Sequence, residues 1–244
     1  MKTIKILLLA ISICTFVNGN AQTKNKEVIK VNYSSGCVSD FLVGMLKKQI
    51  QDANELDKML NMMNRYKIHS SFYQNLKTKE SIFVLDSISE VDNLSTSGYT
   101  YYIHKNQEGL IQGKEIFMGK EINFKTNLKD LKWIITEEQK DINGYQCKKA
   151  KLESNPKVNV WFTPEIPVKS GPYMFYGLPG LVLEADSYFE SINALSISYE
   201  SKENFQNKLK EVKRKINEEK DETILVKELF IKKENFQRMI TKGK

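Results

Sequence analysis

Few residues in this chain have the types and spacing that catalysis requires. The two histidines, His69 and His104, each fall in an alternating stretch typical of a strand, and neither belongs to a His-Glu-x-x-His spacing. The sequence contains no Gly-x-Ser-x-Gly elbow and no dinucleotide-binding glycine fingerprint. Adjacent carboxylates such as Glu137 and Glu138 need not face one cleft. These patterns favour a non-enzymatic protein with no metal and no cofactor.

The cysteines are the remaining candidates for reactive chemistry. Cys14 lies in an N-terminal segment that we expect to be removed, which leaves Cys37 and Cys147. In an oxidising compartment the two could form a disulfide, closing a loop of about 110 residues and stabilising the fold by about 4–5 kcal/mol. Two separate thiols, one of them buried, are the alternative. A thiol or peptidase-like activity at Cys147, with a histidine as base, would be the enzymatic version.

The first 21 residues have the pattern of an export signal. Lys2 and Lys5 precede an apolar run over 6–17, and Gly19-Asn-Ala21 places small residues where a signal peptidase cleaves. The apolar run is too short for a membrane span, which needs about 20 residues. Ile13, before Cys14, is not the small residue that lipidation requires. We therefore expect an exported protein, periplasmic or extracellular, with no lipid anchor and no transmembrane segment after residue 21.

The charge pattern argues against nucleic acid as a partner. The formal charge is +7, from 37 lysines and arginines against 30 acidic residues, and only three of the basic residues are arginines. Arginine is the residue that recognises phosphates and guanine edges in bidentate fashion. The basic excess is concentrated in residues 201–244, where lysines alternate with glutamates and few aromatic residues are available for stacking. A solvated helix face explains that segment better.

The remaining pattern predicts one α+β domain over residues 22–244. Short alternating or apolar stretches separated by turn signals predict about ten strands, the last at 223–231 before a basic tail. Apolar spacing of three and four predicts a helix near 40–64 and another near 202–222. The first contains four methionines, and we interpret them as helical core rather than as a ligand-facing or metal-binding surface. A predominantly antiparallel, curved sheet is the expected architecture.

A proline- and glycine-rich loop is the most unusual feature. All five prolines fall between Pro156 and Pro179, and the segment cannot continue in a central sheet because proline lacks a donor. The loop is interpreted either as a rigid corner packed over one end of the sheet or as a recognition surface for a ligand or partner. The candidate binding residues are Trp161, Pro164, Pro167, Tyr173, Phe175, Gly177, Leu178, Pro179 and Gly180.

Gly177-Leu-Pro-Gly-Leu-Val182 resembles the motif of the GLPGLI family. The likeness extends over residues 128–186 through Leu131-Lys-Trp133, Gly144-Tyr-Gln-Cys147 and Trp161-Phe-Thr-Pro-Glu-Ile-Pro167. Two departures are Val182, where the family has isoleucine, and Asn155-Pro-Lys157, where it has Gly-Arg. The resemblance implies an exported protein of the Bacteroidetes cell envelope without a defined reaction. The sheet is also similar to the half-barrels of periplasmic lipoprotein carriers, although by analogy alone.

Together these patterns predict an exported, non-enzymatic binding or partner protein of the cell envelope. Its loop would contact a hydrophobic small molecule or another envelope protein. The alternatives are an envelope enzyme that uses Cys147 and a purely structural component.

Overall fold

The computed structural model describes residues 26–89, 98–187 and 190–242, so the expected signal segment lies outside the described residues. Within these ranges the chain forms four α-helices and a single twelve-stranded sheet. The helices are α1 (Asp40–Gln49), α2 (Ala53–Asn64), α3 (Lys202–Glu218) and α4 (Val226–Lys242). The strands are β1 (Val28–Gly36), β2 (Ile68–Asn75), β3 (Ser81–Ile88), β4 (Gly98–Lys105), β5 (Leu110–Phe117), β6 (Lys120–Asn127), β7 (Trp133–Ile142), β8 (Tyr145–Leu152), β9 (Asn155–Thr163), β10 (Leu181–Ser187), β11 (Glu190–Glu200) and β12 (Thr223–Leu225).

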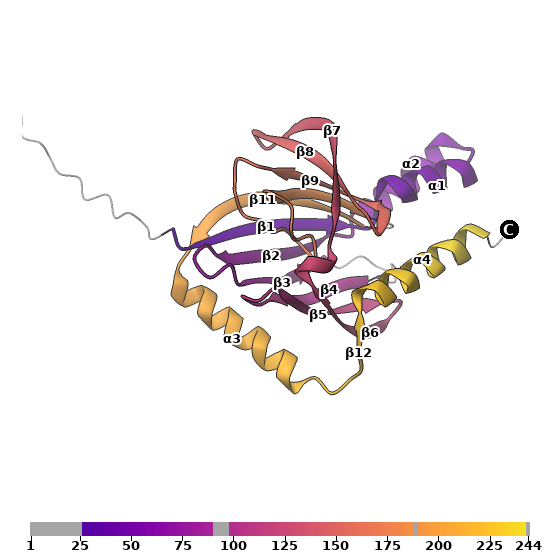
Figure 1. Cartoon of the computed structure of the whole chain (residues 1–244). Coiled ribbons are helices and arrows are strands. Elements are labelled where there is room, and N and C mark those ends of the chain that lie inside the picture. The colour runs from indigo at the N-terminus through magenta and orange to yellow at the C-terminus, as the bar shows by residue number, and fades with distance from the viewer. Residues whose placement is uncertain (1–25, 90–97, 188–189, 243–244) are drawn as a thin grey trace, which may run out of the picture.

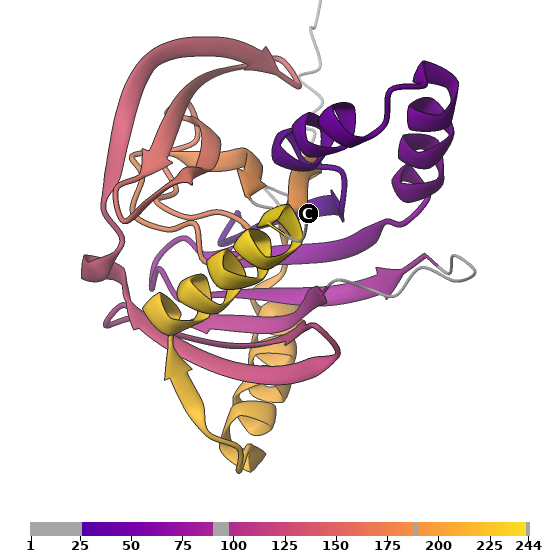
Figure 2. The same cartoon turned by 90° about the vertical axis from the view of Figure 1, so that its right-hand side faces the viewer.

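The sheet is antiparallel except at one edge. Its strand order is β12-β6-β5-β4-β3-β2-β1-β11-β10-β9-β8-β7, and only β12 and β6 run parallel. The sheet curls without closing, so that it surrounds an interior on its concave side (Figures 1 and 2). This confirms the predicted α+β class and the curved antiparallel sheet.

The helix α3 covers part of the outer face of the sheet. Its apolar stripe of Phe205, Leu209 and Val212 packs on Tyr73 and Tyr102 in a cluster separate from the main core. The Ser201 hydroxyl caps the helix by accepting a hydrogen bond from the Asn204 amide at 3.1 Å. The helix predicted near 202–222 is therefore present, ending at Glu218.

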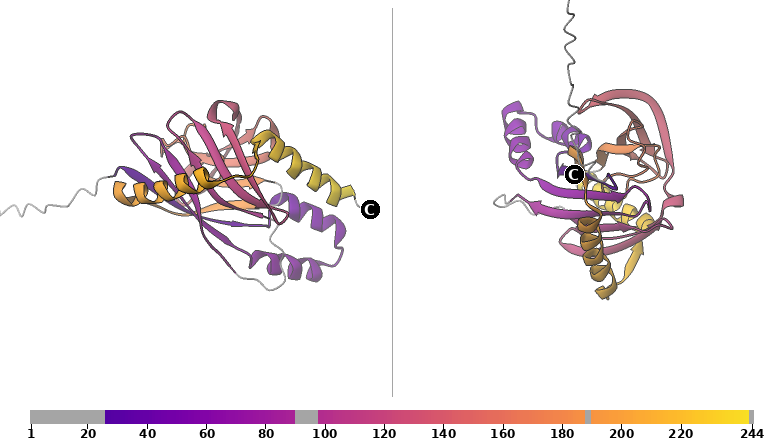
Figure 3. Two further views of the ribbon diagram at one scale, coloured as in Figure 1. Left: turned by 90° about the horizontal axis from the view of Figure 1, so that it is seen from below. Right: turned by 90° about the vertical axis from the view of Figure 1, so that its left-hand side faces the viewer.

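The helix predicted near 40–64 is two helices. Asp52 interrupts it, because its carboxylate accepts hydrogen bonds from the amides of Asn54 and Glu55 at 2.8 and 2.9 Å and so begins α2. No residue of α2 is buried, and in α1 only Leu42 and Leu46 are. The expected helical core is thus mostly surface. Figure 3 shows α1, α2 and the C-terminal end of α4 together at one end of the sheet.

The strand predicted at 223–231 is mostly a helix. β12 covers only Thr223–Leu225, and α4 begins at Val226. Val226 and Leu229 lie on one helical face and are buried against the concave side of the sheet. There α4 runs across the open side of the curved sheet (Figure 2). In the described part of the chain, none of the helices has the length and hydropathy needed to cross a membrane.

Candidate functional site

The proline- and glycine-rich loop lies inside the curved sheet. The consecutive residues Tyr173 to Tyr176 and Leu178 are each at most 3% exposed and belong to the main core. Two hydrogen bonds fix the segment: Trp133 Nε1 donates to the Tyr176 carbonyl at 2.8 Å, and Tyr33 Oη donates to the Val182 carbonyl at 2.6 Å. The loop is therefore a large part of the hydrophobic core of the protein.

Glycine is required where the loop rejoins the sheet. A Cβ on Gly180 would lie 2.1 Å from the carbonyl oxygen of Thr163, a backbone atom that cannot move aside. The Gly-Leu-Pro-Gly motif thus brings two backbone segments into contact where β9 and β10 meet.

The nine candidate loop residues divide between the interior and the surface. Phe175, Leu178 and Gly180 are buried and have no access to a ligand in this structure. Trp161 is half-buried on the outer face, with the Nζ atoms of Lys140 and Lys149 at 4.5 and 5.6 Å from its ring centroid. Exposed positions are Pro164, Pro167, Gly177 and Pro179.

Tyr173 is the loop residue that the structure places in a polar cluster. Its backbone has a φ of 53°, a left-handed conformation unusual for a side chain of this size. Its hydroxyl donates to Glu115 Oε2 at 2.6 Å and accepts from Lys233 Nζ at 3.0 Å. Lys233 Nζ also lies 3.0 Å from Glu115 Oε1. Glu115 of β5, Tyr173 of the loop and Lys233 of α4 are thereby joined in one buried cluster.

A small hollow of about 60 Å³ opens beside this cluster, at the end of the sheet near α1 and α2. We call it the Glu115 hollow. Strand ends, the turn after β1 and α4 contribute its lining, which combines aromatic rings, hydroxyls and charged groups. The lining residues are Gly36, Cys37, Tyr66, Ile68, Gly98, Tyr99, Thr100, Glu115, Ile116, Phe117, Ser187, Glu190, Lys233 and Phe236.

The electrostatics of the Glu115 hollow are set by two carboxyl groups and one ammonium group. Burial raises the pKa of Glu190, Lys233 opposes that rise, and Glu115 adds to it. The raised pKa favours a Glu190 carboxyl that holds its proton more readily than an exposed glutamate. Among the described residues, no three side chains of His, Cys, Asp or Glu come together as a metal site. The Glu115 hollow therefore presents donors and acceptors of hydrogen bonds next to apolar surface.

The two cysteines are separate thiols. Cys37 Sγ donates to the Met63 carbonyl at 3.6 Å, and Cys147 Sγ donates to the Tyr145 carbonyl at 3.5 Å. Cys37 and Cys147 are thus two free thiols, of which Cys147 is buried. The disulfide that the sequence allowed as an alternative is not formed between them. Burial is the main reason that the pKa of Cys147 is raised to about 11, so thiolate is scarce at neutral pH.

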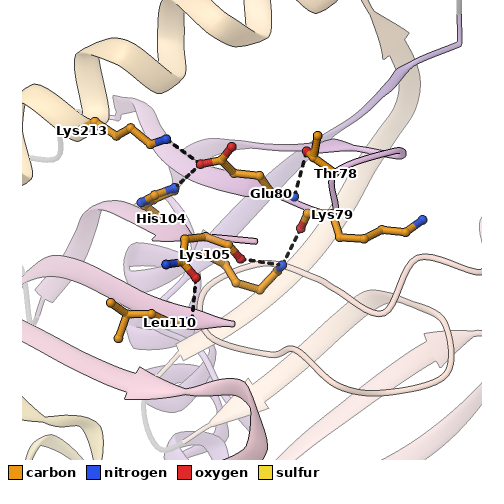
Figure 4. A network of polar contacts seen from close by, with 8 residues as sticks. Thr78, Lys79, Glu80, His104, Lys105, Leu110 and Lys213 are labelled. Atoms are coloured by element: carbon orange, nitrogen blue, oxygen red, sulfur yellow. Dashed lines mark hydrogen bonds and ion pairs between the residues drawn. The ribbon is translucent and has the colours of Figure 1, made fainter. Parts of the chain in front are cut away.

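A second polar network lies at the end of β4 that is farther from the Glu115 hollow (Figure 4). Glu80 Oε1 is 2.8 Å from His104 Nε2 and 2.7 Å from Lys213 Nζ of α3. The buried Lys105 donates to the carbonyl of Lys79. These contacts tie α3 and the β2–β3 turn to β4, so the network has a structural role.

This network predicts a pH-dependent stability. Burial lowers the pKa of His104 more than the Glu80 carboxylate raises it, and Lys213 and Lys105 add to the decrease. A lowered pKa means that the unfolded chain binds this proton more readily. The stabilisation is therefore complete above the ordinary value of about 6.5 and is lost as the pH falls through the folded-state value. Urea unfolding at about pH 7.5 and about pH 5.5 should show a smaller pH effect for His104→Gln than for the unmodified protein. Equal losses in the two proteins would contradict this assignment.

A larger groove of about 720 Å³ runs along the other side of α4. Leu110, Leu131, Phe230 and Ile231 are among its lining residues. It lacks the buried charges of the Glu115 hollow, so it offers less specific recognition.

The family comparison identifies the chain through its sequence. The family described as "N-glycanase peptide, N-terminal domain" matches residues 76–226, more than half of the chain. This chain belongs to that family. The matched range includes Glu115, Tyr173 and Glu190, and ends at the first residue of α4. It also spans residues 128–186, so the resemblance to the GLPGLI family is wrong.

Comparison with solved structures adds little to this membership. Two structures of PNGF-II, in space groups C2 and P2₁, match 71% and 72% of the chain at 16% and 17% identity, each with a TM-score of 0.43. An uncharacterised conserved protein from Thermus thermophilus matches 75% of the chain and 85% of its own length at 3% identity, with a TM-score of 0.35. The chain spans 28% and 29% of the two PNGF-II chains. No curated protein matches it.

Sequence reasoning missed Glu115, Glu190 and Lys233. A signal for Glu115 was present, because it follows Ile111 and Gly113 on the inward-facing positions of β5, where a charged residue is unusual. Lys233 was overlooked because its segment was predicted to be a strand and a basic tail. The pairing of these residues depends on the curvature of the sheet.

Proposed function

We propose that this chain is an exported, non-catalytic glycan-recognition domain that binds carbohydrate at the Glu115 hollow. The observation that carries the proposal is Tyr173. Its left-handed backbone holds a hydroxyl between a buried carboxylate and an ammonium group, directly beside a hollow with aromatic walls. Backbone conformations of this cost persist where the surrounding structure enforces them, and they cluster at binding sites.

The chemistry of the Glu115 hollow suits a sugar. A pyranose has apolar C–H faces that pack on aromatic rings, and its hydroxyls need both donors and acceptors. Tyr66, Tyr99, Phe117 and Phe236 supply rings, and the charged groups supply hydrogen bonds. The family supports the same class of ligand, since it is described as belonging to an N-glycanase.

Recognition is favoured over catalysis by the placement of the reactive groups. The thiol of Cys147 is buried with a raised pKa, whereas His104 lies in the network around Glu80. The thiol-enzyme alternative therefore receives no support from geometry. A hydrophobic ligand held inside the sheet, as in the half-barrel carriers, would need the space that residues 173–178 occupy.

Export of the chain remains a proposal that rests on the pattern of residues 1–21. It does not rest on a disulfide, because Cys37 and Cys147 are free thiols. An envelope protein as partner is the second candidate, favoured by the exposed apolar side chains Met62, Ile231 and Met239 on the helices.

Calorimetric titration of the protein with a released N-glycan tests the proposed function. Phe236→Ala removes a ring of the hollow that packs against Phe117 with centroids 5.8 Å apart. It should weaken binding about two- to tenfold, since aromatic contacts contribute about 0.5–1.5 kcal/mol. Met239→Ala is the matched control, because that side chain is exposed on the same helix and does not line the hollow. No heat of binding with the unmodified protein, or equal weakening by both substitutions, would contradict the proposal.

A further inference from the structure

The methionines of α2 are not part of the core. This helix contains Met59, Met62 and Met63, and none of its residues is buried. Met62 is 43% exposed, and the other two are partly exposed. The helix projects beyond the end of the sheet, next to α1 (Figures 1 and 3). Filling gaps in a core, the usual role of methionine, therefore does not explain this cluster.

The spacing of the three methionines places their sulfur atoms on one side of the helix. Met62 and Met63 follow Met59 by three and four residues, and positions with these separations are neighbours on a helix surface. Long side chains of a helix also point back over the preceding turn, so Met62 and Met63 extend toward the level of Met59. Because methionine is unbranched and flexible, the three sulfurs can then reach one bound atom.

The backbone of the methionine cluster is held at the C-terminal end of α2. The amides of Arg65 and Tyr66 donate to the carbonyls of Met62 and Met63 at 3.3 and 3.1 Å. Tyr66 is itself buried, and Cys37 Sγ donates to the Met63 carbonyl at 3.6 Å. The sulfurs are therefore presented from a fixed helical turn, which reduces the entropy lost when they bind a ligand.

The sulfur of a thioether is a soft ligand without charge. Soft sulfur ligands select Cu(I), whereas carboxylate, carbonyl and water oxygens suit Mg²⁺ and Ca²⁺. The acidic Glu55 and Asp57 of α2 outnumber its single basic residue, Lys58, and so favour a cation over an anion. The chemistry of the cluster thus fits a soft monovalent cation.

We propose that Met59, Met62 and Met63 form a binding site for Cu(I) on α2. Each sulfur donates a lone pair to the ion, and no covalent bond is broken and no electron is transferred. None of the three methionines lines the Glu115 hollow, so this site is independent of the proposed glycan recognition. The thiol of Cys37 lies at the end of the same helix and is a competing soft donor, so its contribution is tested by a variant of its own.

Competition for Cu(I) against bathocuproine disulfonate, with ascorbate and without oxygen, measures the affinity of the full chain. Met59→Leu, Met62→Leu and Met63→Leu in combination remove the sulfurs but keep apolar side chains of similar volume, so the helix is retained. We expect this triple variant to bind at least about tenfold more weakly, since loss of even an outer-shell partner of a metal costs about 10–100-fold.

Met239→Leu is the matched control, because that methionine is 59% exposed on α4, and it should leave the affinity unchanged. Equal affinities of the triple variant and of the control, or no binding by the unmodified protein, would overturn the inference.

Cys37→Ser tests whether the thiol alone accounts for binding. We expect this variant to keep most of the affinity, and to keep it equally at about pH 6 and about pH 8, because a thioether has no proton to lose on binding a metal. Loss of binding in Cys37→Ser, with binding retained in the triple variant, would assign the ion to the thiol and contradict the proposal.

Methyl resonances of protein labelled with ¹³C-methyl-methionine locate the ion directly, with Ag(I) as a soft ion of the same charge. The resonances of Met59, Met62 and Met63 should shift, whereas those of the buried Met174 and the exposed Met239 should not. Mg²⁺ should shift none of them, since it takes oxygen ligands. Equal shifts at Met239 and at the α2 methionines would show unspecific binding and overturn the site.

Discussion

Phe175→Ala is expected to lower the free energy of unfolding by about 3–5 kcal/mol, as removal of a fully buried aromatic ring does elsewhere. The ring is 2% exposed and lies between Trp133 and Tyr173, with centroids 6.1 and 5.5 Å away. The hydrogen bonds at Trp133 and Tyr33 restrain the loop, so it cannot collapse easily into the space that the ring leaves. Urea unfolding at neutral pH measures the effect.

Tyr199→Ala is the control for loss of an aromatic side chain. Tyr199 is 45% exposed on β11, and its truncation should change stability by no more than about 0.5–1 kcal/mol. A Phe175→Ala protein as stable as the control would show that residues 173–178 are not core. Loss of ligand binding with unchanged stability would instead favour the loop as a recognition surface.

Glu115→Ala is expected to have the second-largest effect, about 3 kcal/mol of stability together with loss of glycan binding. The carboxylate is buried and accepts from Tyr173 at 2.6 Å, and Lys233 is its ion-pair partner. Removing one partner of a buried ion pair costs about 3–5 kcal/mol because the other charge is left without compensation. We expect the lower end of this range of free energy because the Lys233 side chain is 17% exposed and can reach water.

A double substitution separates folding from binding at this position. Glu115→Leu with Lys233→Met replaces both charges by apolar groups and should recover most of the stability, since a buried ion pair often adds little net stability. Glycan binding should stay lost. Glu218→Ala is the control, because its ion pair with Arg214 is exposed and contributes about 0.3–0.5 kcal/mol. A small loss of stability in Glu115→Ala, similar to that of the control, would contradict the buried cluster.

Strand alternation and the apolar stripe of α3 were sufficient to predict the class of this fold. Ile29, Val31 and Tyr33 alternate in β1 because one face of that strand is core, and such a local pattern is readable without the structure. The helix α4 was not predictable in the same way. The strand β12 (Thr223–Leu225) directly precedes it and pairs with β6, and the β-branched residues there favour a strand over the following helical spacing.

The position of the loop could not be predicted from its prolines. They show that the segment leaves the sheet, but residues that turn inward and residues that turn outward have the same composition. The direction is set by long-range contacts, such as the hydrogen bond from Tyr33 to Val182 across 149 positions of the chain. The cluster of Glu115, Tyr173 and Lys233 is non-local for the same reason, since 118 positions separate Glu115 from Lys233.

The structure also explains why the Gly-Leu-Pro-Gly motif wrongly indicated the GLPGLI family. Gly180 and its neighbours are constrained by backbone contact with Thr163, so the motif describes how two strands are joined rather than what the protein binds. Membership of the N-glycanase N-terminal domain family rests instead on residues 76–226, and that range contains most of the sheet.

A crystal structure of the protein soaked with a released N-glycan tests the central claim most directly. We expect ligand density at the Glu115 hollow, with a polar group of the glycan within hydrogen-bond distance of Glu190 or Lys233 and a sugar ring against Tyr99 or Phe236. Density in the apolar groove beside Leu131 and Phe230, or an unchanged Glu115 hollow at a concentration that saturates binding in solution, would contradict it.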